Sequence, residues 1–320
     1  MVIKDIKYFD LKKITESGQI FRMYEDENGV FTVYSGNRYL KARQDRENET
    51  CFMCSEEEFE DYWEDFFDLK RDYGAIVRHA EALSSKRGDR GSLFIKNACE
   101  YGAGIRILKQ DIWEMMISFI ISQQKQIPSI RKCIEALCRK FGKKHSVKDG
   151  VNGENVWYGF PDAASIASAG PDGLKGLSLG YRERYIYETA VRYLKEGKTD
   201  EEIRKMSFEE AKKYFCAYTG IGEKVADCIC LFSAGFKDAF PIDVHIKDIL
   251  YREFTDEEKK NEIETALKKK MGTEAVGRRK IIDSIPYSGY MEIIEKNFAG
   301  FEGTKGILQQ WIFAYELNAH

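Results

Sequence analysis

Two ionisable residues in the second half of the chain have the types and spacing that covalent chemistry needs. Lys224 follows Gly220-Ile221-Gly222 by two residues, and Asp243 comes 19 residues later, within Pro-Ile-Asp-Val-His. A neutral lysine amine is a nucleophile that forms Schiff bases, and the positive end of a helix favours its neutral form. A helix and loop over this distance can return the carboxylate to the amine, where it would stabilise a cationic transition state.

The two glycines predict how the lysine is held. A helix, then Thr-Gly-Ile-Gly, then a second helix form a helix-hairpin-helix pattern, whose glycines allow a tight turn and close approach of a phosphate. Such hairpins bind the DNA backbone without reading sequence. Simpler roles therefore stay open, with Lys224 as a phosphate contact and Asp243 as a helix N-cap. The cap and the catalytic role are compatible.

The composition is that of a soluble globular protein large enough for two or three domains. Its 320 residues are 43% hydrophobic and 32% charged, and no apolar run approaches the roughly 20 residues that cross a bilayer. The first ten residues lack the apolar core of a signal peptide, so we expect a cytoplasmic protein without a membrane partner. The net charge of −3 disfavours a nonspecific nucleic-acid binder but does not exclude a DNA enzyme, because the local field matters more.

The cysteines and the charge runs have ordinary explanations. The eight cysteines lack the dense spacing of a disulfide scaffold, and the CxxC of Cys51 and Cys54 lacks the second pair that zinc sites use. An acidic run over 56–68 and basic runs over 268–270 and 278–280 fit solvated faces.

The residue pattern predicts an α+β fold that begins with an antiparallel β-sheet. Asn28-Gly29 between two apolar runs is a strong hairpin signal, and Ser55 with Glu58 fits a capping box that starts a helix. The predicted strands are 21–24, 30–34, 39–43 and 50–54. We expect helices to pack against this sheet in an N-terminal domain over 1–108, joined by the C-terminal helix 304–320.

From residue 109 the apolar spacing becomes helical. The predicted helices surround residues 112–120 and 130–141 and lie at 184–195, 208–217, 223–234, 257–271 and 306–316. Glycine and aspartate between 149 and 180 predict a loop with short helices. We therefore expect a mostly helical second domain over 109–303, with the helix-hairpin-helix at 208–235.

Several motifs together resemble the helix-hairpin-helix/Gly-Pro-Asp superfamily of DNA glycosylases, and within it the 8-oxoguanine DNA glycosylases. The matching segments are SGQIFR at 17–22, IRILKQDIWEMMISFIISQQ at 105–124, GYR at 180–182, GIGEKVADCICLF at 220–232 and PIDVHI at 241–246. The combination is far more specific than Gly-Ile-Gly alone. The resemblance implies a DNA glycosylase and AP lyase of base excision repair that acts on chromosomal DNA, and we expect no cofactor. Because nothing in the sequence suggests a long apolar interface stripe, we expect a monomer.

The resemblance also implies what the chemical residues do. The enzyme flips 8-oxoguanine out of duplex DNA, and Lys224 attacks C1′ of the nucleotide, displaces the base and forms a Schiff base that breaks the strand. Asp243 would stabilise the positive charge that develops on the sugar.

Four further residues would surround the flipped base. The Gly18 carbonyl accepts a hydrogen bond from N7–H, Cys228 and Phe313 sandwich the ring, and Gln309 contacts the Watson–Crick edge. Without the resemblance, Gly18 is a turn glycine, Cys228 and Phe313 are packing residues, and Gln309 is a surface amide.

Other residues would contact the remaining DNA. Gln124 fills the gap left by the base, Tyr181 wedges beside the estranged base and Arg182 hydrogen-bonds it. Gly220 and Gly222 admit the backbone, and His245 touches a phosphate. The carbonyls of Cys216, Tyr218 and Ile221 form a candidate site for a structural monovalent cation, and no catalytic metal is implied.

The sequence departs from the family pattern at several positions. Gln124 replaces an asparagine, Phe232 replaces a more flexible residue, and Ser129 stands where the family has an arginine that reads the opposite cytosine. Arg131 is close, but on another helical face. We therefore predict a relaxed opposite-base preference. No cysteine follows Cys230, which argues against the iron–sulfur cluster of related enzymes.

Two other functions remain as alternatives. Another glycosylase of the superfamily, such as one for alkylated bases, generally works by hydrolysis and lacks the lysine. A noncatalytic DNA-binding module would use the hairpin for phosphates alone, and it would not need the spacing between Lys224 and Asp243.

Overall fold

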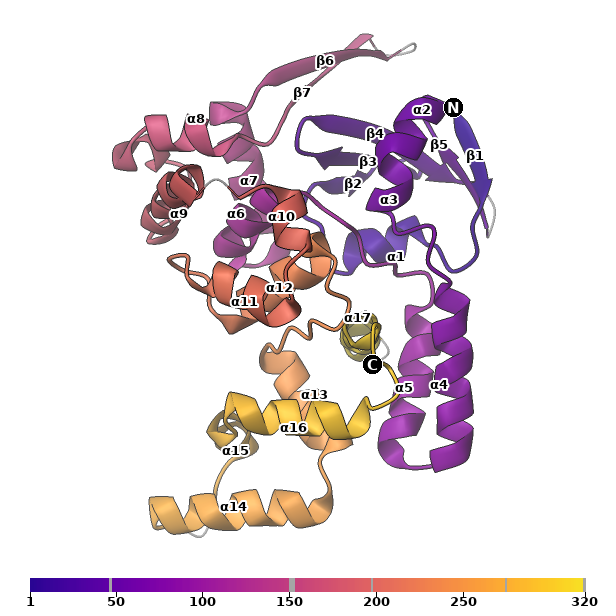
Figure 1. Cartoon of the computed structure of the whole chain (residues 1–320), viewed down its shortest axis with the longest axis vertical. Coiled ribbons are helices and arrows are strands. Elements are labelled where there is room, and N and C mark those ends of the chain that lie inside the picture. Colours follow the sequence, from indigo (N-terminus) through magenta and orange to yellow (C-terminus); the bar gives the residue numbers. More distant parts are fainter. Residues whose placement is uncertain (46–47, 150–152, 197, 274, 319–320) are drawn as a thin grey trace. The chain divides into compact units, whose positions relative to one another are not determined.

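Alternating buried and exposed residues build the N-terminal sheet. Every second residue of β3 (Val30–Ser35) is buried, as a strand with one face on the core requires. The computed structural model describes residues 1–45, 48–149, 153–196, 198–273 and 275–318. Its five-stranded sheet has the antiparallel order β1-β5-β4-β3-β2 (Figure 1). The other strands are β1 (Val2–Asp5), β2 (Met23–Glu25), β4 (Arg38–Gln44) and β5 (Glu49–Phe52). The four predicted strands are confirmed, and β1 is an additional strand.

The hairpin between β2 and β3 forms where Asn28-Gly29 predicts it. Gly29 has a positive φ of 71°, which glycine adopts without strain. The Asp26 carboxylate accepts hydrogen bonds from the amides of Asn28 and Val30, both at 2.9 Å. These local bonds fix the turn, and with it the pairing of Met23 with Val33.

Short helices cover one side of this sheet with aromatic side chains. Ser55 caps the first turn by accepting from the amide of Glu58 at 3.1 Å, and the Glu58 carboxylate accepts from the indole of Trp63 at 3.1 Å. The elements are α1 (Leu11–Glu16), α2 (Glu56–Glu58), a π-helical turn η1 (Phe59–Trp63) and α3 (Glu64–Phe66). Phe59, Trp63 and Phe66 are buried in one cluster with the apolar face of the sheet.

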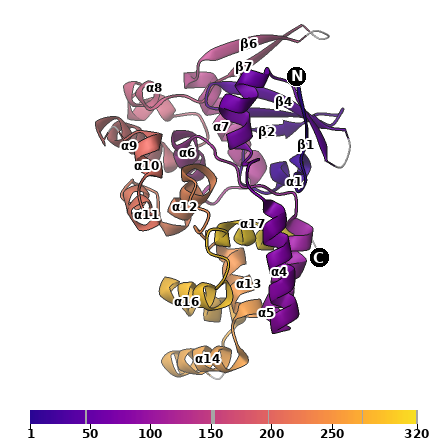
Figure 2. The same ribbon diagram turned by 45° about the vertical axis from the view of Figure 1, so that its right-hand side comes forward.

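A buried helix, α6 (Ile112–Ser122), lies at the centre of the helices that include the predicted helix-hairpin-helix (Figure 2). Its residues from Ile112 to Ile121 are all buried, because α7, α9 and α12 pack against it. The surrounding elements are α7 (Ile127–Phe141), α8 (Ala163–Ser168), η2 (Pro171–Leu174), α9 (Arg182–Glu196), α10 (Asp200–Arg204), α11 (Phe208–Cys216), α12 (Glu223–Ile229) and a π-helical turn η3 (Cys230–Ala234). The sheet and these helices form the first unit, which contains Met1–Arg71 and Gly104–Ala239.

The prediction of a loop with short helices over 149–180 is wrong at its beginning. Strands β6 (Lys144–Asp149) and β7 (Gly153–Tyr158) form a hairpin there, before the short helices α8 and η2. Trp157 stacks on His145 and on Tyr39 of β4, with ring centroids 4.4 and 5.9 Å apart. The contact with Tyr39 joins residues more than a hundred positions apart, so local composition does not reveal the strands.

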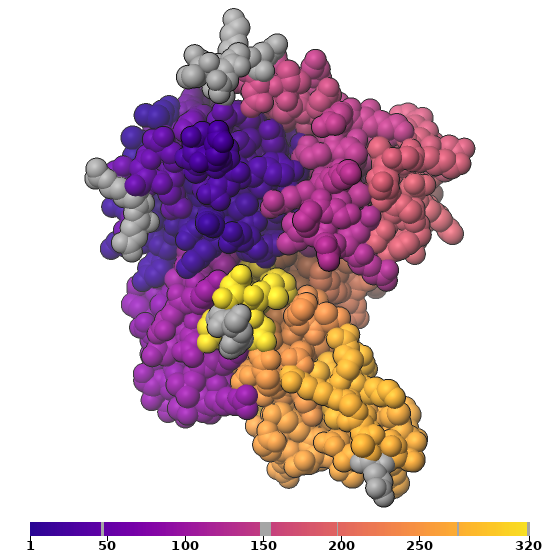
Figure 3. All heavy atoms as spheres, turned by 180° about the vertical axis from the view of Figure 1, so that it is seen from behind, coloured from indigo at the N-terminus to yellow at the C-terminus, as the bar shows by residue number. Residues whose placement is uncertain are grey.

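The second unit contains Asp72–Ala103 and Phe240–His320. Its helices are α4 (Tyr73–Arg87), α5 (Arg90–Gly102), α13 (Val244–Phe254), α14 (Glu257–Met271), α15 (Arg278–Ser284), α16 (Tyr287–Asn297) and α17 (Lys305–Asn318). The C-terminal α17 lies against α4 and α5 although about two hundred residues separate them (Figure 3). Among the described residues, no helix is both long and apolar enough to cross a membrane.

These units divide the chain differently from the predicted domains 1–108 and 109–303. Residues 72–103, expected beside the sheet, belong with the last helices because Gly102 lets α5 approach α17 closely. A Cβ on Gly102 would lie 2.4 Å from Trp311. Within the second unit, α17 contacts α4 and α5, which come from the predicted N-terminal domain.

Candidate functional site

The helix-hairpin-helix forms in the first unit where the sequence predicts it. Ser207 caps α11 in a reciprocal capping box with Glu210. The turn after α11 closes through hydrogen bonds from Tyr218 N to Phe215 O at 3.0 Å and from Ile221 N to Tyr218 O at 3.1 Å. Gly222 then begins α12 in an extended conformation and, as a glycine, offers no side chain to cap the first turn of the helix.

The two hairpin glycines, Gly220 and Gly222, differ in backbone conformation and in the space around them. Gly220 has a φ of 83°, and a Cβ there would lie 2.4 Å from the ring of Tyr185 on α9. Gly222 has an ordinary φ of −92°, is exposed, and a Cβ there would meet nothing within 4 Å. The fold therefore requires glycine at 220, whereas at 222 the missing side chain leaves open space beside the first-turn amides.

Lys224 lies in the first turn of α12, half-buried against aromatic rings. Its Nζ lies 5.6 Å from the ring centroid of Phe119 on α6. Phe119 in turn stacks on Phe232 with centroids 5.8 Å apart, and it meets Phe21 edge-on at 5.5 Å. Phe232, a departure from the family pattern, thus builds the apolar wall behind the ring that the amine faces.

A cavity of about 510 Å³ brings four predicted site residues together. Its lining residues are Ser122, Gln123, Gln124, Gly220, Gly222, Glu223, Lys224 and Val225. Gln124 is exposed and has a positive φ of 52°, which is uncommon for a residue other than glycine. Gln123 donates from Nε2 to the carbonyl of Gly220 at 2.6 Å. The loop that carries Gln124 is therefore bonded directly to the hairpin.

Arg182 is part of the same network. It is buried, and it donates from Nη1 to the Leu179 carbonyl at 3.1 Å and from Nη2 to the Gln123 carbonyl. Its guanidinium carbon lies 4.4 Å from the ring centroid of Tyr181, whose side chain is 49% exposed. Within the described residues, Arg182 Nε is buried without a hydrogen-bond partner. Arg182 thus holds the Gln124 loop rather than facing solvent as a base reader would.

Gly18 lies in a turn fixed by buried amides. Its φ is 78°, which favours glycine, and its residue is only partly exposed. Gln19 donates from Nε2 to the Arg106 carbonyl at 2.9 Å and accepts at Oε1 from the amide of Leu108 at 2.9 Å. The side chain of Gln110 donates to the Gln19 carbonyl at 2.8 Å. The Gly18 turn is thereby tied to the segment 106–110.

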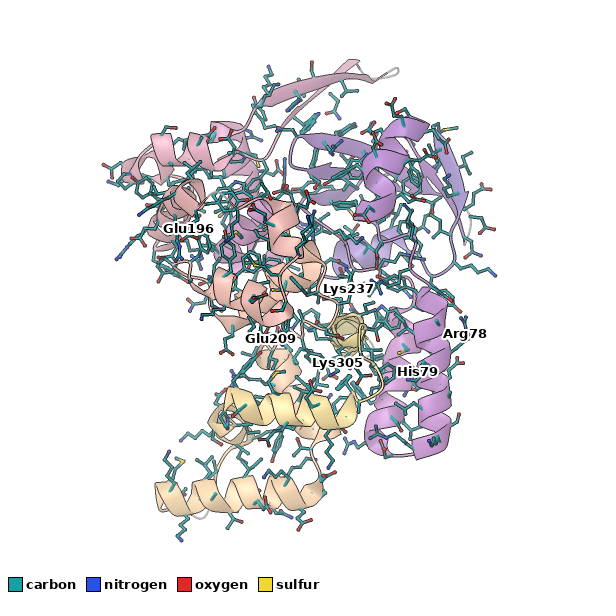
Figure 4. All side chains as sticks on the ribbon, in the orientation of Figure 1. Arg78, His79, Glu196, Glu209, Lys237 and Lys305 are labelled. Atoms are coloured by element: carbon teal, nitrogen blue, oxygen red, sulfur yellow. The ribbon has the colours of Figure 1, made fainter. Side chains whose placement is uncertain are left out.

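The same segment also contacts residues that follow α12. The amide of Gln110 donates to the Phe232 carbonyl at 2.9 Å, and the buried Lys237 donates to the Ile107 carbonyl at 3.2 Å (Figure 4). Burial lowers the pKa of Lys237 to about 7, an effect that the nearby Asp68 opposes. Segment 106–110 therefore joins the Gly18 turn to the turn that follows α12, through contacts that sequence spacing does not reveal.

Two further predictions fall in the hairpin region. Cys228 is buried on α12 one turn after Lys224. Three carbonyls are proposed to hold a monovalent cation. That of Tyr218 already accepts the Ile221 amide but keeps a second lone pair. The other two, of Cys216 and Ile221, precede and follow Tyr218 along the chain. The cation site stays a prediction.

The second unit carries the other predicted site residues. Asp243 is the N-cap of α13, and its Oδ1 accepts from the amides of His245 and Ile246, both at 2.9 Å. His245 is exposed, and its ring lies edge-on to Phe313 of α17 at 6.2 Å. Gln309, one turn earlier on α17, is buried, and its Oε1 has no hydrogen-bond partner in the described part of the chain. The structure thus groups His245 with Phe313, and confirms Asp243 as a cap.

Ser129 and Arg131, which the resemblance links to the opposite base, have different surroundings. Ser129 is exposed near the start of α7. Arg131 turns to the N-terminal segment, where Nη2 donates to the Thr15 carbonyl at 3.4 Å and the guanidinium lies 5.3 Å from the ring centroid of Tyr24. Arg131 is therefore already engaged away from the exposed face that carries Ser129.

Sequence comparison finds two matching families in succession. Residues 1–116 match the 8-oxoguanine DNA glycosylase N-terminal domain, and residues 117–272 match the HhH-GPD superfamily base excision DNA repair proteins. An N-glycosylase/DNA lyase of Saccharomyces cerevisiae is 33% identical over 190 residues, which cover 56% of this chain and 49% of that protein. The chain spans about half the length of the curated relatives it matches.

Solved structures are similar over nearly their whole length. The structure of MBOgg1 in complex with a low-affinity DNA ligand is 31% identical, with a TM-score of 0.76 over 99% of this chain and 95% of that chain. The 8-oxoguanine glycosylase/lyase of Clostridium acetobutylicum, in complex with DNA containing cytosine opposite 8-oxoguanine, is 28% identical. Its TM-score is 0.77, over 99% of this chain and 95% of that chain.

Proposed function

Because the chain belongs to the 8-oxoguanine DNA glycosylase family of the HhH-GPD superfamily, we propose that it excises 8-oxoguanine from duplex DNA and then cleaves the strand as an AP lyase. The observation that carries this proposal is the cavity that Lys224 shares with Gln124, Gly220 and Gly222. Excision from a duplex needs a nucleophile, a turn that holds the backbone and a side chain that enters the emptied stack. All three lie around one depression.

In the proposed reaction, the damaged nucleotide leaves the stack and Lys224 attacks its C1′ atom. A bond forms between Nζ and C1′ while the bond from C1′ to the base breaks, so the base leaves with the electron pair. The amine nitrogen loses a proton as the base gains one. Opening of the sugar ring then gives a Schiff base, from which β-elimination breaks the C3′–O bond.

Asp243 is the proposed partner for the positive charge of this reaction. Both of its hydrogen bonds to the first turn of α13 use Oδ1, so they fix the carboxylate and leave Oδ2 for the reacting sugar. A carboxylate whose position is set before the reaction stabilises the transition state without reorganising. Capping and catalysis are then two uses of one side chain.

The proposed recognition of the oxidised base depends on the Gly18 turn. Only the oxidised base carries a proton on N7, which the Gly18 carbonyl would accept. Because buried amides of Gln19 and Gln110 hold this turn, the carbonyl has little freedom to turn away. Cys228 and Phe313 would cover the faces of the base. Gln309 would use its Oε1, which has no hydrogen-bond partner among the described residues, at the Watson–Crick edge.

In this proposal the enzyme discriminates only weakly between bases opposite 8-oxoguanine. Arg182 would contact the estranged base only after giving up its bonds to Leu179 and Gln123, and Tyr181 would wedge beside that base. Ser129 offers no guanidinium, and Arg131 is held by Thr15 and Tyr24. One strong base contact is therefore missing, which predicts a relaxed preference for cytosine.

The proposal is tested by measuring free base release from matched duplexes. Each duplex carries one 8-oxoguanine, one guanine or one alkylated purine at the same position, and the released base is identified by mass. We expect release of 8-oxoguanine alone. Release of only the alkylated purine would identify another glycosylase of the superfamily, and tight binding without any release would identify a noncatalytic module.

A further inference from the structure

A strongly basic segment lies in the second unit, outside the site described above. Residues 268–280, here called the basic segment, contain six Lys or Arg residues and one acidic residue, a formal charge of +5 in a chain whose net charge is −3. Such a local excess attracts a polyanion even when the whole protein is acidic. The basic residues are Lys268, Lys269, Lys270, Arg278, Arg279 and Lys280.

Ion pairs with described residues neutralise three of these six cations. Lys268 pairs with Glu264, Arg278 with Asp248 and Arg279 with Asp283, at 2.7, 2.5 and 2.9 Å. Lys269, Lys270 and Lys280 are exposed, and no ion pair to them is found among the described residues. Three lysines of the basic segment therefore face solvent without an ion pair to any residue that the structure describes.

Helix electrostatics explains only part of this arrangement. The lysines at 268–270 end α14, where cations interact favourably with the helix dipole. Residues 278–280, however, form the first turn of α15, where the same dipole disfavours cations and no acidic residue is present. Ion pairs with Asp248 and Asp283 offset this cost for Arg278 and Arg279. Lys280 has no such pair among the described residues, so its placement at this helix start points to a binding role.

The basic segment adjoins the helix that starts at the proposed site. Arg278 binds Asp248, which lies three residues after His245 and therefore on the same side of α13, one turn further. Figure 1 shows α15 between α13 and the C-terminal end of α14, and α15 packs against both. A duplex that reaches His245 with a phosphate would thus pass close to the basic segment.

We propose that the basic segment binds the phosphate backbone of duplex DNA flanking the damaged nucleotide. This inference rests on the proposed function, because His245 marks where the lesion lies. Lysines bind phosphates without reading bases and release condensed counterions, so the contact adds affinity and salt dependence, but not specificity. The segment lengthens the footprint and holds the enzyme on undamaged DNA while it searches.

The test compares a triple variant with a matched control. The variant K269Q/K270Q/K280Q removes the three uncompensated charges, and the control K7Q/K86Q/K195Q removes three exposed lysines elsewhere. Binding to undamaged duplexes of about 9 and about 30 base pairs, at roughly 3.4 Å per base pair, is measured across a salt series. We expect the triple variant to bind the long duplex about tenfold or more weakly, with a salt slope lower by up to about 2.7.

The outcomes separate this proposal from its premise. An unchanged affinity and salt slope, or an equal loss in the control variant, would overturn the role of the basic segment. An equal loss of binding on both duplex lengths would overturn its flanking position. Binding to single-stranded RNA is measured in the same way, and a loss of affinity confined to this RNA would overturn DNA as the partner. Single-turnover excision with saturating enzyme should be unchanged in the triple variant. Failure of the wild type to release 8-oxoguanine would instead reject the proposed function.

Discussion

At the scale of single residues, substitution can separate the observed cap role of Asp243 from its proposed catalytic role. Asparagine is as good an N-cap as aspartate, because its side-chain oxygen can accept the same amides of His245 and Ile246. We therefore expect Asp243→Asn to keep the melting temperature nearly unchanged while excision falls by about 100-fold or more, since the negative charge is lost. Thermal melts and single-turnover excision measure the two effects.

Asp243→Ala is the matched comparison. It removes the cap as well as the charge, so it should also cost about 1 kcal/mol of stability. If Asp243→Asn retained near wild-type excision, the carboxylate would be only a cap.

Ser129 carries the prediction on the opposite base. Because no arginine stands there and Arg131 is held elsewhere, we expect 8-oxoguanine opposite adenine to be removed less than about 100-fold more slowly than opposite cytosine. Ser129→Arg should widen this ratio, by the roughly 1–3 kcal/mol of a good base contact. Single-turnover rates on the two duplexes decide the matter, and a wild-type ratio above about 100 would contradict the prediction.

At the scale of elements, the two hairpin glycines should respond differently to alanine. Gly220→Ala should cost roughly 1–2 kcal/mol of stability, because φ is positive and the Cβ would overlap Tyr185. Gly222→Ala should cost no more than about 1 kcal/mol of stability, because alanine is the poorer N-cap. It should weaken binding of undamaged duplex by about 1 kcal/mol or more, because the Cβ would stand between amides and a phosphate. Melting and anisotropy titrations measure these effects.

A double variant isolates the steric cause at Gly220. In a Tyr185→Ala background, the cost of Gly220→Ala should shrink, since only the backbone strain remains. If Gly222→Ala bound DNA like the wild type, the hairpin would not approach the backbone at that residue.

Sequence patterns predict the elements whose cause is local. Asn28-Gly29 predicts the β2–β3 hairpin, and regular charge and apolar spacing predicts α14 with its observed bounds, Glu257–Met271. The β6–β7 hairpin escapes prediction because its stacking partner, Tyr39, lies on a distant strand. The grouping of α4 and α5 with α17 escapes it as well, because Gly102 reveals its packing role only against Trp311.

The candidate site likewise contains residues that sequence patterns predict and residues that they do not. Lys224, its glycines and Gln124 are found from the motif and share one cavity. Gln123 and Tyr185, which hold the hairpin at Gly220, carry no local pattern because their contacts span 97 and 35 positions. Arg182 has the predicted location, but its bonds hold the Gln124 loop, which only the folded structure reveals.

At the scale of the whole molecule, the buried Lys237 makes stability depend on pH. Its pKa is lowered to about 7 by burial, against 10.5 in an unfolded chain. Between these values the unfolded chain holds a proton that the folded chain lacks, so the free energy of unfolding rises with pH from about 7 to about 10. At about 1.4 kcal/mol per pKa unit, the effect amounts to a few kcal/mol.

Lys237→Met removes this group while keeping an unbranched apolar stem. We expect the variant to be more stable than the wild type at pH 7, although loss of the hydrogen bond to Ile107 offsets part of this gain. Its free energy of unfolding should also depend less on pH. Urea unfolding followed by tryptophan fluorescence between pH 6 and 9.5 measures this. Lys7→Met, at an exposed lysine, is the control and should keep the wild-type slope. An unchanged slope in Lys237→Met would contradict the account.

The central claim is that Lys224 forms a covalent bond with the DNA, and borohydride trapping tests it most directly. Wild type and Lys224→Gln are incubated with a duplex that contains one 8-oxoguanine, and the reductant converts any Schiff base into a stable adduct. The account predicts a protein–DNA adduct with the wild type and none with the variant. Base release without an adduct in the wild type would show a hydrolytic glycosylase, and an equal adduct in Lys224→Gln would show that another amine is the nucleophile.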